Sequence, residues 1–113
     1  MAAGKYNILI QQGADYLQPI TIRNSETGVA INLTGAVITG QVREDYTSAT
    51  PLASFTVQNT DLANGKFTLT IPASTTTTMS FDTGVYDVEV LYASGQKDRL
   101  LQGSVVFSPE VTK

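Results

Sequence analysis

Residues 82–91 read Asp-Thr-Gly-Val-Tyr-Asp-Val-Glu-Val-Leu, and this stretch decides the fold. Tyr86 and the two valines that follow it alternate with Asp87 and Glu89, and a period of two residues is typical of a strand with one face in the core and one in water. The residues before the strand favour a turn. We therefore predict a half-buried β-strand over Val85–Leu91.

The same alternation recurs along the chain in short runs bounded by turn residues. Its apolar positions are Tyr6, Ile8 and Ile10, then Tyr16, Ile20 and Ile22, then Ile38 and Val42, then Phe55 and Val57 after Pro51, and finally Phe67, Leu69 and Ile71. The turn Ala93-Ser94-Gly95 predicts an antiparallel hairpin between 85–91 and 99–107. Helical structure is expected only as one short turn within 72–80, capped by Ser74 or a threonine.

About seven strands without interleaved helices predict an all-β fold, a two-sheet β-sandwich of antiparallel strands. The form Asp82-x-Gly84-x-Tyr86 is that of the residues that introduce strand F of immunoglobulin-like domains, where the tyrosine hydroxyl bonds to upstream backbone as a structural corner. An ordinary turn before a strand with a core tyrosine is the alternative. We expect one domain over 1–113, with 108–113 as a loose C-terminal tail.

Composition excludes several functional classes. The chain has 113 residues, 15% of them charged, a net charge of −3, and neither His nor Cys. Its basic residues are scattered, which argues against nucleic-acid binding. The N-terminus lacks the features of a signal peptide and no stretch has the length of a membrane span, so we expect synthesis in a cytoplasm and no membrane contact.

Carboxylate pairs are the remaining candidates for catalysis. Glu44 and Asp45 are adjacent on an expected loop, and Asp87 and Glu89 share the solvent face of a strand. Each pair is better explained as a solvated surface feature, and no loop has the acidic density of a calcium site. We therefore predict a protein that is not an enzyme, with no catalytic residue, cofactor or metal.

Tyr46 differs from the other aromatic residues because it lies in the middle of the loop 44–50. We expect it to be exposed, as a contact residue for a partner. A carbohydrate-binding module for host attachment is an alternative, although such modules ordinarily expose Trp, which this chain lacks.

The sequence also resembles small structural proteins encoded in tailed-phage and prophage virion gene clusters, and it is similar to the N-terminal domain of phage baseplate upper proteins. The resemblance covers nearly the whole chain and lies in turn and core residues: Tyr6-Asn7-Ile8, Gln12-Gly13-Ala14-Asp15, Asn32-Leu33-Thr34-Gly35, Gln41-Val42-Arg43, Gly65-Lys66-Phe67-Thr68-Leu69, Gly84-Val85-Tyr86-Asp87-Val88-Glu89 and Leu100-Leu101-Gln102-Gly103. It implies a β-sandwich that attaches receptor-binding or fibre parts to a tail hub. Asn32 departs from the aspartate of many relatives, and the sequence stops at Lys113 where relatives often continue into a fibre-linking region.

These expectations give a non-enzymatic virion protein, made in the host bacterial cytoplasm, that joins neighbouring tail, baseplate or fibre subunits in several symmetric copies. A capsid decoration protein is the alternative within the same class. The segments expected to contact other virion proteins are 5–11, 44–50 and 108–113, and the candidate contact residues are Lys5, Tyr6, Asn7, Glu44, Asp45, Tyr46, Thr47, Pro109, Glu110 and Val111.

Overall fold

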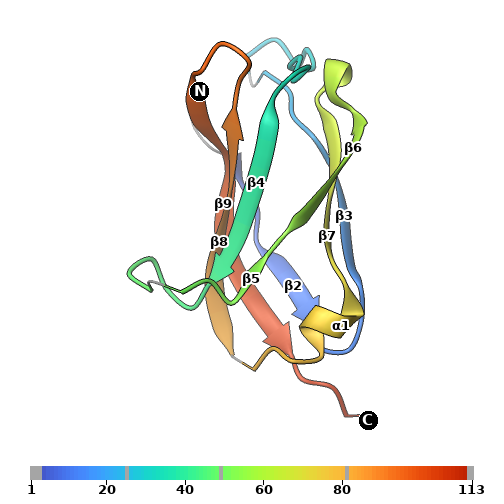
Figure 1. Cartoon of the computed structure of the whole chain (residues 1–113), viewed down its shortest axis with the longest axis vertical. Coiled ribbons are helices and arrows are strands. Elements are labelled where there is room, and N and C mark those ends of the chain that lie inside the picture. Colours follow the sequence, from blue (N-terminus) through green and yellow to red (C-terminus); the bar gives the residue numbers. More distant parts are fainter. Residues whose placement is uncertain (1–3, 25, 49, 81, 112–113) are drawn as a thin grey trace.

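A computed structural model describes residues 4–24, 26–48, 50–80 and 82–111 of the chain. The described residues form two β-sheets that pack face to face in an elongated sandwich (Figure 1). The molecule measures 44 × 28 × 23 Å along its principal axes. The predicted all-β sandwich is confirmed.

The larger sheet has the order β1-β9-β8-β4-β5, with β2 also paired to β9, and the smaller has the order β3-β7-β6. The strands are β1 (Gly4–Lys5), β2 (Ile8–Gln11), β3 (Tyr16–Thr21), β4 (Val37–Arg43), β5 (Ala53–Ser54), β6 (Thr56–Asp61), β7 (Lys66–Ile71), β8 (Thr83–Leu91) and β9 (Lys97–Ser108). A 3-10 turn, η1 (Leu62–Asn64), and one short helix, α1 (Ala73–Thr76), complete the described elements.

The core lies between the two sheets and is built from the alternating positions. Phe67, Leu69 and Ile71 of β7 are almost fully buried, as are Val88 and Val90 of β8. At roughly 25 cal/mol per Å² of apolar surface, such side chains supply most of the energy that holds the sheets together. The inward faces predicted for these two strands are confirmed.

The N-terminal strands pair with β9 in parallel, which corrects the expectation that all strands are antiparallel. Ile8 aligns with Val105 and Ile10 with Phe107, and all four side chains are buried. Strands β8 and β9 form the predicted antiparallel hairpin, with a register irregularity after Val88.

The strand expected after Pro51 is in fact two strands in different sheets. Strand β5 pairs with β4, whereas β6 pairs with β7. Phe55 lies at the crossing, where its backbone N–H donates to the Gly40 carbonyl at 2.9 Å. Its ring packs 6.0 Å from the rings of both Tyr16 and Tyr86. The crossing therefore ties the two sheets together along one side (Figure 1).

The predicted helical turn is present as α1, but its expected cap is wrong. Pro72 occupies the N-cap position, and Asp15 supplies the acceptor from another segment, because its Oδ1 receives the Ala73 N–H at 2.6 Å. A local turn forms at Asn32, whose Oδ1 accepts the Thr34 N–H at 2.9 Å. Within the described part of the chain, no helix has the length and apolar content needed to cross a bilayer.

Candidate functional site

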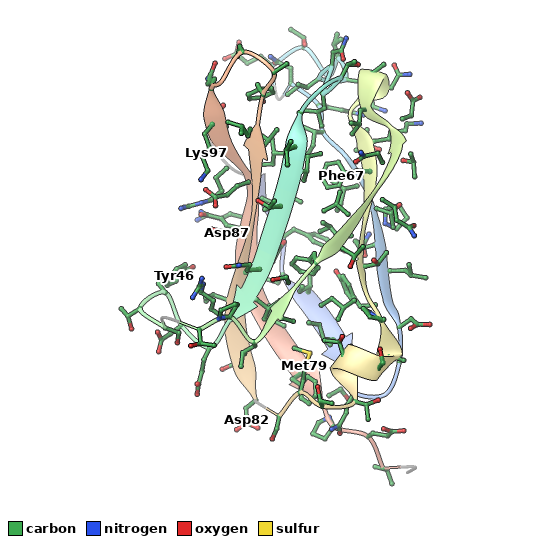
Figure 2. All side chains as sticks on the ribbon, viewed as in Figure 1. Tyr46, Phe67, Met79, Asp82, Asp87 and Lys97 are labelled. Carbon is green, nitrogen blue, oxygen red and sulfur yellow. The ribbon has the colours of Figure 1, made fainter. Side chains whose placement is uncertain are left out.

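The loop after β4 holds Tyr46 away from the body of the protein. We call residues 44–48 the Tyr46 loop; Ala49 lies outside the described residues. Tyr46 is 76% exposed, the highest value for any described aromatic side chain. Figure 2 shows it on the loop that projects from the lower left of the sandwich. The predicted exposure is confirmed.

Asp45 organises this loop from within. Its Oδ1 accepts hydrogen bonds from the Thr47 hydroxyl at 2.7 Å, the Thr47 N–H at 2.9 Å and the Ser48 hydroxyl at 3.2 Å. These bonds, those from Thr47 first, lower the pKa of Asp45. Arg43 anchors the base of the loop by donating from Nη1 to the Ser48 carbonyl at 2.7 Å. Tyr46 is therefore presented on a pre-ordered turn.

A hollow of about 190 Å³ lies between the Tyr46 loop and the outer face of the larger sheet. We call it the Tyr46 hollow, and it is lined by Gln41, Arg43, Tyr46, Val85, Tyr86, Asp87 and Arg99. The strand register explains the grouping, because Gln41 lies opposite Asp87 and Arg43 opposite Val85, while Asp87 lies opposite Gln102 of β9.

Charged side chains continue from this hollow across the outer face of β4, β8 and β9. We call this surface the charged face; its polar residues are Gln41, Arg43, Asp87, Glu89, Lys97, Arg99 and Gln102. Arg99 Nε lies 3.4 Å from Asp87 Oδ2, and Lys97 Nζ lies 3.7 Å from Glu89 Oε2. Figure 2 shows Asp87 and Lys97 on this side of the sandwich, with Phe67 between the sheets.

Opposing electrostatic effects act on the pKa of Asp87 in the charged face. Partial burial and the neighbouring Glu89 raise the pKa of Asp87, and Arg99 and Arg43 only partly offset this rise. Both carboxylates of the sequence-predicted pair are thus engaged by cations. In the other pair, Asp45 holds its own loop, whereas Glu44 lines a separate hollow with Asp82. No group of three His, Cys, Asp or Glu that could hold a metal occurs among the described residues.

Lys5, Tyr6 and Asn7, the N-terminal candidate contact residues, belong to a segment that is bonded to β9. Lys5 is exposed in β1. The Tyr6 N–H donates to the Gln102 carbonyl at 3.0 Å, and Asn7 Oδ1 accepts the Ser104 N–H at 3.1 Å. Tyr6 keeps 45% of its surface exposed. This segment forms an edge of the larger sheet, and its backbone already pairs with β9 on one side.

The C-terminal candidates lie at the lower end of the molecule, away from the Tyr46 loop (Figure 1). The Glu110 N–H donates to Gln12 Oε1 at 2.8 Å, so the segment predicted as a loose tail is attached at least to this point. Pro109 and Val111 are exposed, Val111 at 95%. Residues 112–113 of the predicted tail lie outside the described residues.

The predicted bond from the Tyr86 hydroxyl to upstream backbone is present, but its acceptor lies much further upstream than the turn before β8. Tyr86 is buried, and its hydroxyl donates to the carbonyl of Tyr6, which lies 80 residues upstream in the N-terminal segment. Gly84 lies within β8, and the Asp82 carbonyl accepts the Phe107 N–H at 3.0 Å. Tyr86 therefore secures the N-terminal segment and not the turn just before its own strand.

Sequence reasoning missed the neighbours of Tyr46. Gln41, Arg43 and Arg99 occupy outward positions of strands, where a polar residue is expected whatever its role. Only the pairing of β4, β8 and β9 brings them beside the loop. The alternation in the sequence predicts on which face of the sheet a side chain lies, but it does not predict which residue lies beside it on the neighbouring strand.

No protein-family model and no curated protein matches the chain. In three dimensions, the chain is similar to a chain in the crystal structure of ICOS in complex with ICOS-L and an anti-ICOS-L VNAR domain. The TM-score is 0.51 and the identity is 12%, over 96% of this chain and 56% of that chain. The fold is immunoglobulin-like. An internalin-like protein of Listeria monocytogenes matches at 16% identity over 96% of this chain and 28% of its own length, with a TM-score of 0.35 that is too low to support an argument.

The immunoglobulin-like topology agrees with the sheet order. The order β3-β7-β6 matches the B-E-D strands of such domains, and β9-β8-β4-β5 matches G-F-C-C′. Tyr86 then lies on the F strand, as the sequence predicts. At 12% identity this likeness concerns the fold alone, and the chain spans about half of the solved chain that it resembles.

Proposed function

We propose that this protein is a non-enzymatic structural protein of a tailed-phage virion, a tail or baseplate component that joins neighbouring subunits through the Tyr46 loop. One observation carries the binding role: Tyr46 is 76% exposed on a turn that Asp45 and Arg43 hold in place. A large aromatic ring fixed in this way loses little entropy when a partner covers it.

The surroundings of Tyr46 support a protein partner. Interface anchors are enriched in tyrosine and arginine, and here Arg43 and Arg99 line the same hollow as Tyr46. The virion assignment is supported by the sequence resemblance, which covers nearly the whole chain. A modest contact of this kind gains strength when it is repeated in a symmetric assembly.

The test is incorporation into particles made by the phage or prophage that encodes the chain. Particles purified on a density gradient should contain the protein, detected by mass spectrometry of the washed fraction. Tyr46→Ala should lower its amount by roughly tenfold or more, as expected for loss of an anchor residue. Tyr46→Phe, which keeps the ring, is the matched control and should incorporate close to the native level.

The same experiment separates the alternatives. Immunogold labelling at the tail tip supports the baseplate assignment, whereas labelling over the shell replaces it with a capsid decoration role. Complete absence of the chain from the particles overturns the virion proposal. Tyr46-dependent retention of a sugar on a glycan array, with no incorporation into particles, would favour the carbohydrate-binding module.

A further inference from the structure

We infer that the partner inserts an acidic side chain, Asp or Glu, into the Tyr46 hollow, where its carboxylate pairs with Arg43. This inference rests on the proposed docking through the Tyr46 loop and names the chemistry of its partner. Three features of the hollow support it: a guanidinium without a close ion pair, a local excess of positive charge, and a size that fits one side chain.

Arg43 has no close ion-pair partner among the described residues, although it and Asp87 attract each other across the hollow. Its hydrogen bonds run to neutral acceptors, from Nη1 to the Ser48 carbonyl at 2.7 Å and from Nη2 to Gln41 Oε1 at 2.8 Å. Among the described residues, the ion pairs are those of Arg99 and Lys97. A guanidinium has five N–H donors, so Arg43 retains donors for a further acceptor, and a carboxylate is the acceptor that binds it most strongly.

The charge of the surrounding surface favours an anion. The charged face carries Arg43, Lys97 and Arg99 against Asp87 and Glu89, although the chain as a whole has seven basic and ten acidic residues. The acids of the Tyr46 loop do not line the Tyr46 hollow. Asp45 Oδ1 is directed to Thr47 and Ser48 within the loop, and Glu44 lines a different hollow. The hollow itself therefore contains two cations, Arg43 and Arg99, and one carboxylate, Asp87, and this local balance favours an anion.

The size of the hollow selects among anions. Sites for drug-sized ligands enclose roughly 300–1,000 Å³, whereas the Tyr46 hollow encloses about 190 Å³. This volume suits one carboxylate side chain with the Tyr46 ring covering it. A polyphosphate is disfavoured because it carries several negative charges, whereas the hollow supplies only one net positive charge, from Arg43 and Arg99 against Asp87.

An NMR titration of the full chain with a capped hexaglutamate peptide tests the inference. Amide shifts should concentrate at residues 41–48, 85–87 and 99, and raising the salt concentration should weaken binding because the attraction is between exposed charges. Arg43→Gln should raise the dissociation constant about tenfold, the size expected when a charge-assisted hydrogen bond is lost.

Lys66→Gln is the matched control, because it removes the same charge from the exposed side of β7 in the other sheet. It should leave the dissociation constant within about twofold of the native value. Because Arg43 also anchors the loop, Arg99→Gln provides a second variant that leaves the Ser48 contact in place and should also weaken binding. Shifts spread over the surface, or equal weakening by Lys66→Gln and Arg43→Gln, would overturn the inference.

Two further outcomes separate this inference from the function on which it rests. Binding of heparin, but not hexaglutamate, at the same residues overturns the acidic side chain in favour of an anionic glycan. Particle incorporation that is lost in Tyr46→Ala but unaffected by Arg43→Gln and Arg99→Gln overturns the inference and leaves the docking role intact. Hexaglutamate binding by a chain absent from particles supports the inference and overturns the virion assignment.

Discussion

At the scale of single residues, two tyrosine hydroxyls differ in whether they are hydrogen-bonded. The Tyr86 hydroxyl donates to the Tyr6 carbonyl, whereas the buried Tyr16 hydroxyl has no hydrogen-bond partner among the described residues. The rings of Tyr16 and Tyr86 both pack against Phe55. A satisfied hydroxyl stabilises the fold, and an unsatisfied one destabilises it.

Replacing Tyr86 by phenylalanine should destabilise the protein. The change leaves the Tyr6 carbonyl without its donor, which typically reduces the free energy of unfolding by about 1–3 kcal/mol. Urea denaturation followed by circular dichroism measures the loss. Tyr46→Phe, on the exposed loop, should change stability by no more than about 0.5 kcal/mol. Equal effects of the two substitutions would contradict the structural role of Tyr86.

Alkaline pH should weaken the fold through Tyr16. Burial, and then the nearby Tyr6, raise the pKa of Tyr16 from 10.0 to about 12. A raised folded-state pKa contributes stability below pH 10 that is lost as the pH rises to about 12. The urea concentration at the unfolding midpoint should fall between pH 10 and about 12. Tyr16→Phe should make this fall with pH less steep. Part of the pH dependence should remain in Tyr16→Phe, because burial also raises the pKa of Tyr86. An unchanged slope in Tyr16→Phe would refute this account.

At the scale of elements, α1 is too short to be stable alone and depends on the segment before β3. Thr76 is fully buried, and its hydroxyl donates to the Ala14 carbonyl at 2.9 Å and accepts the Gly13 N–H at 3.2 Å. Gln12 Nε2 donates to the Thr77 carbonyl at 3.2 Å. These contacts join the lower ends of the two sheets, the end from which the C-terminal segment leaves.

Thr76→Val should therefore weaken this junction while keeping its shape. Loss of the hydroxyl leaves the partly buried Gly13 N–H and Ala14 carbonyl without this partner, so the free energy of unfolding should fall by about 1–2 kcal/mol. Thr76→Ser should retain most of the stability. Thr78→Val, in an exposed position of the same segment, serves as the control in chemical denaturation. A Thr76→Val protein as stable as the native one would show that the junction contributes nothing.

At the scale of the whole molecule, the passage from β5 to β6 makes the two sheets one unit. Phe55 is buried at the crossing and contacts both sheets through Tyr16 of β3 and Tyr86 of β8. Gly40 permits this approach, because a Cβ at its position would lie 2.9 Å from the Phe55 ring. A substitution at Phe55 should therefore destabilise both sheets together.

Phe55→Ala should lower the free energy of unfolding by about 3–5 kcal/mol, which is a large share of the roughly 5–15 kcal/mol typical of a domain. Thermal unfolding followed by circular dichroism should show one transition at a much lower temperature. Leu17→Ala, at a position 62% exposed on β3, should leave that temperature nearly unchanged. Two separate transitions in the Phe55→Ala protein would mean that the sheets unfold independently.

The sequence by itself determined most of the strands, the buried faces of β7 and β8, and the exposure of Tyr46. Alternation over Phe67–Ile71 and Tyr86–Val90 is a local property, and burial follows it directly. Side chains that bond to their own backbone, such as Asn32, are equally local. These features needed no knowledge of which strands are neighbours.

The tertiary structure alone decided the parallel pairing of the N-terminal strands with β9, the acceptor of Tyr86 and the grouping of Arg43 and Arg99 beside Tyr46. These arrangements join distant parts of the chain: Tyr86 and Tyr6 are 80 positions apart, Ile8 lies opposite Val105, and Arg99 comes to lie beside the Tyr46 loop. Sheet order and register arise from the packing of all the strands at once, because a strand's own pattern fixes its faces and leaves its partners open.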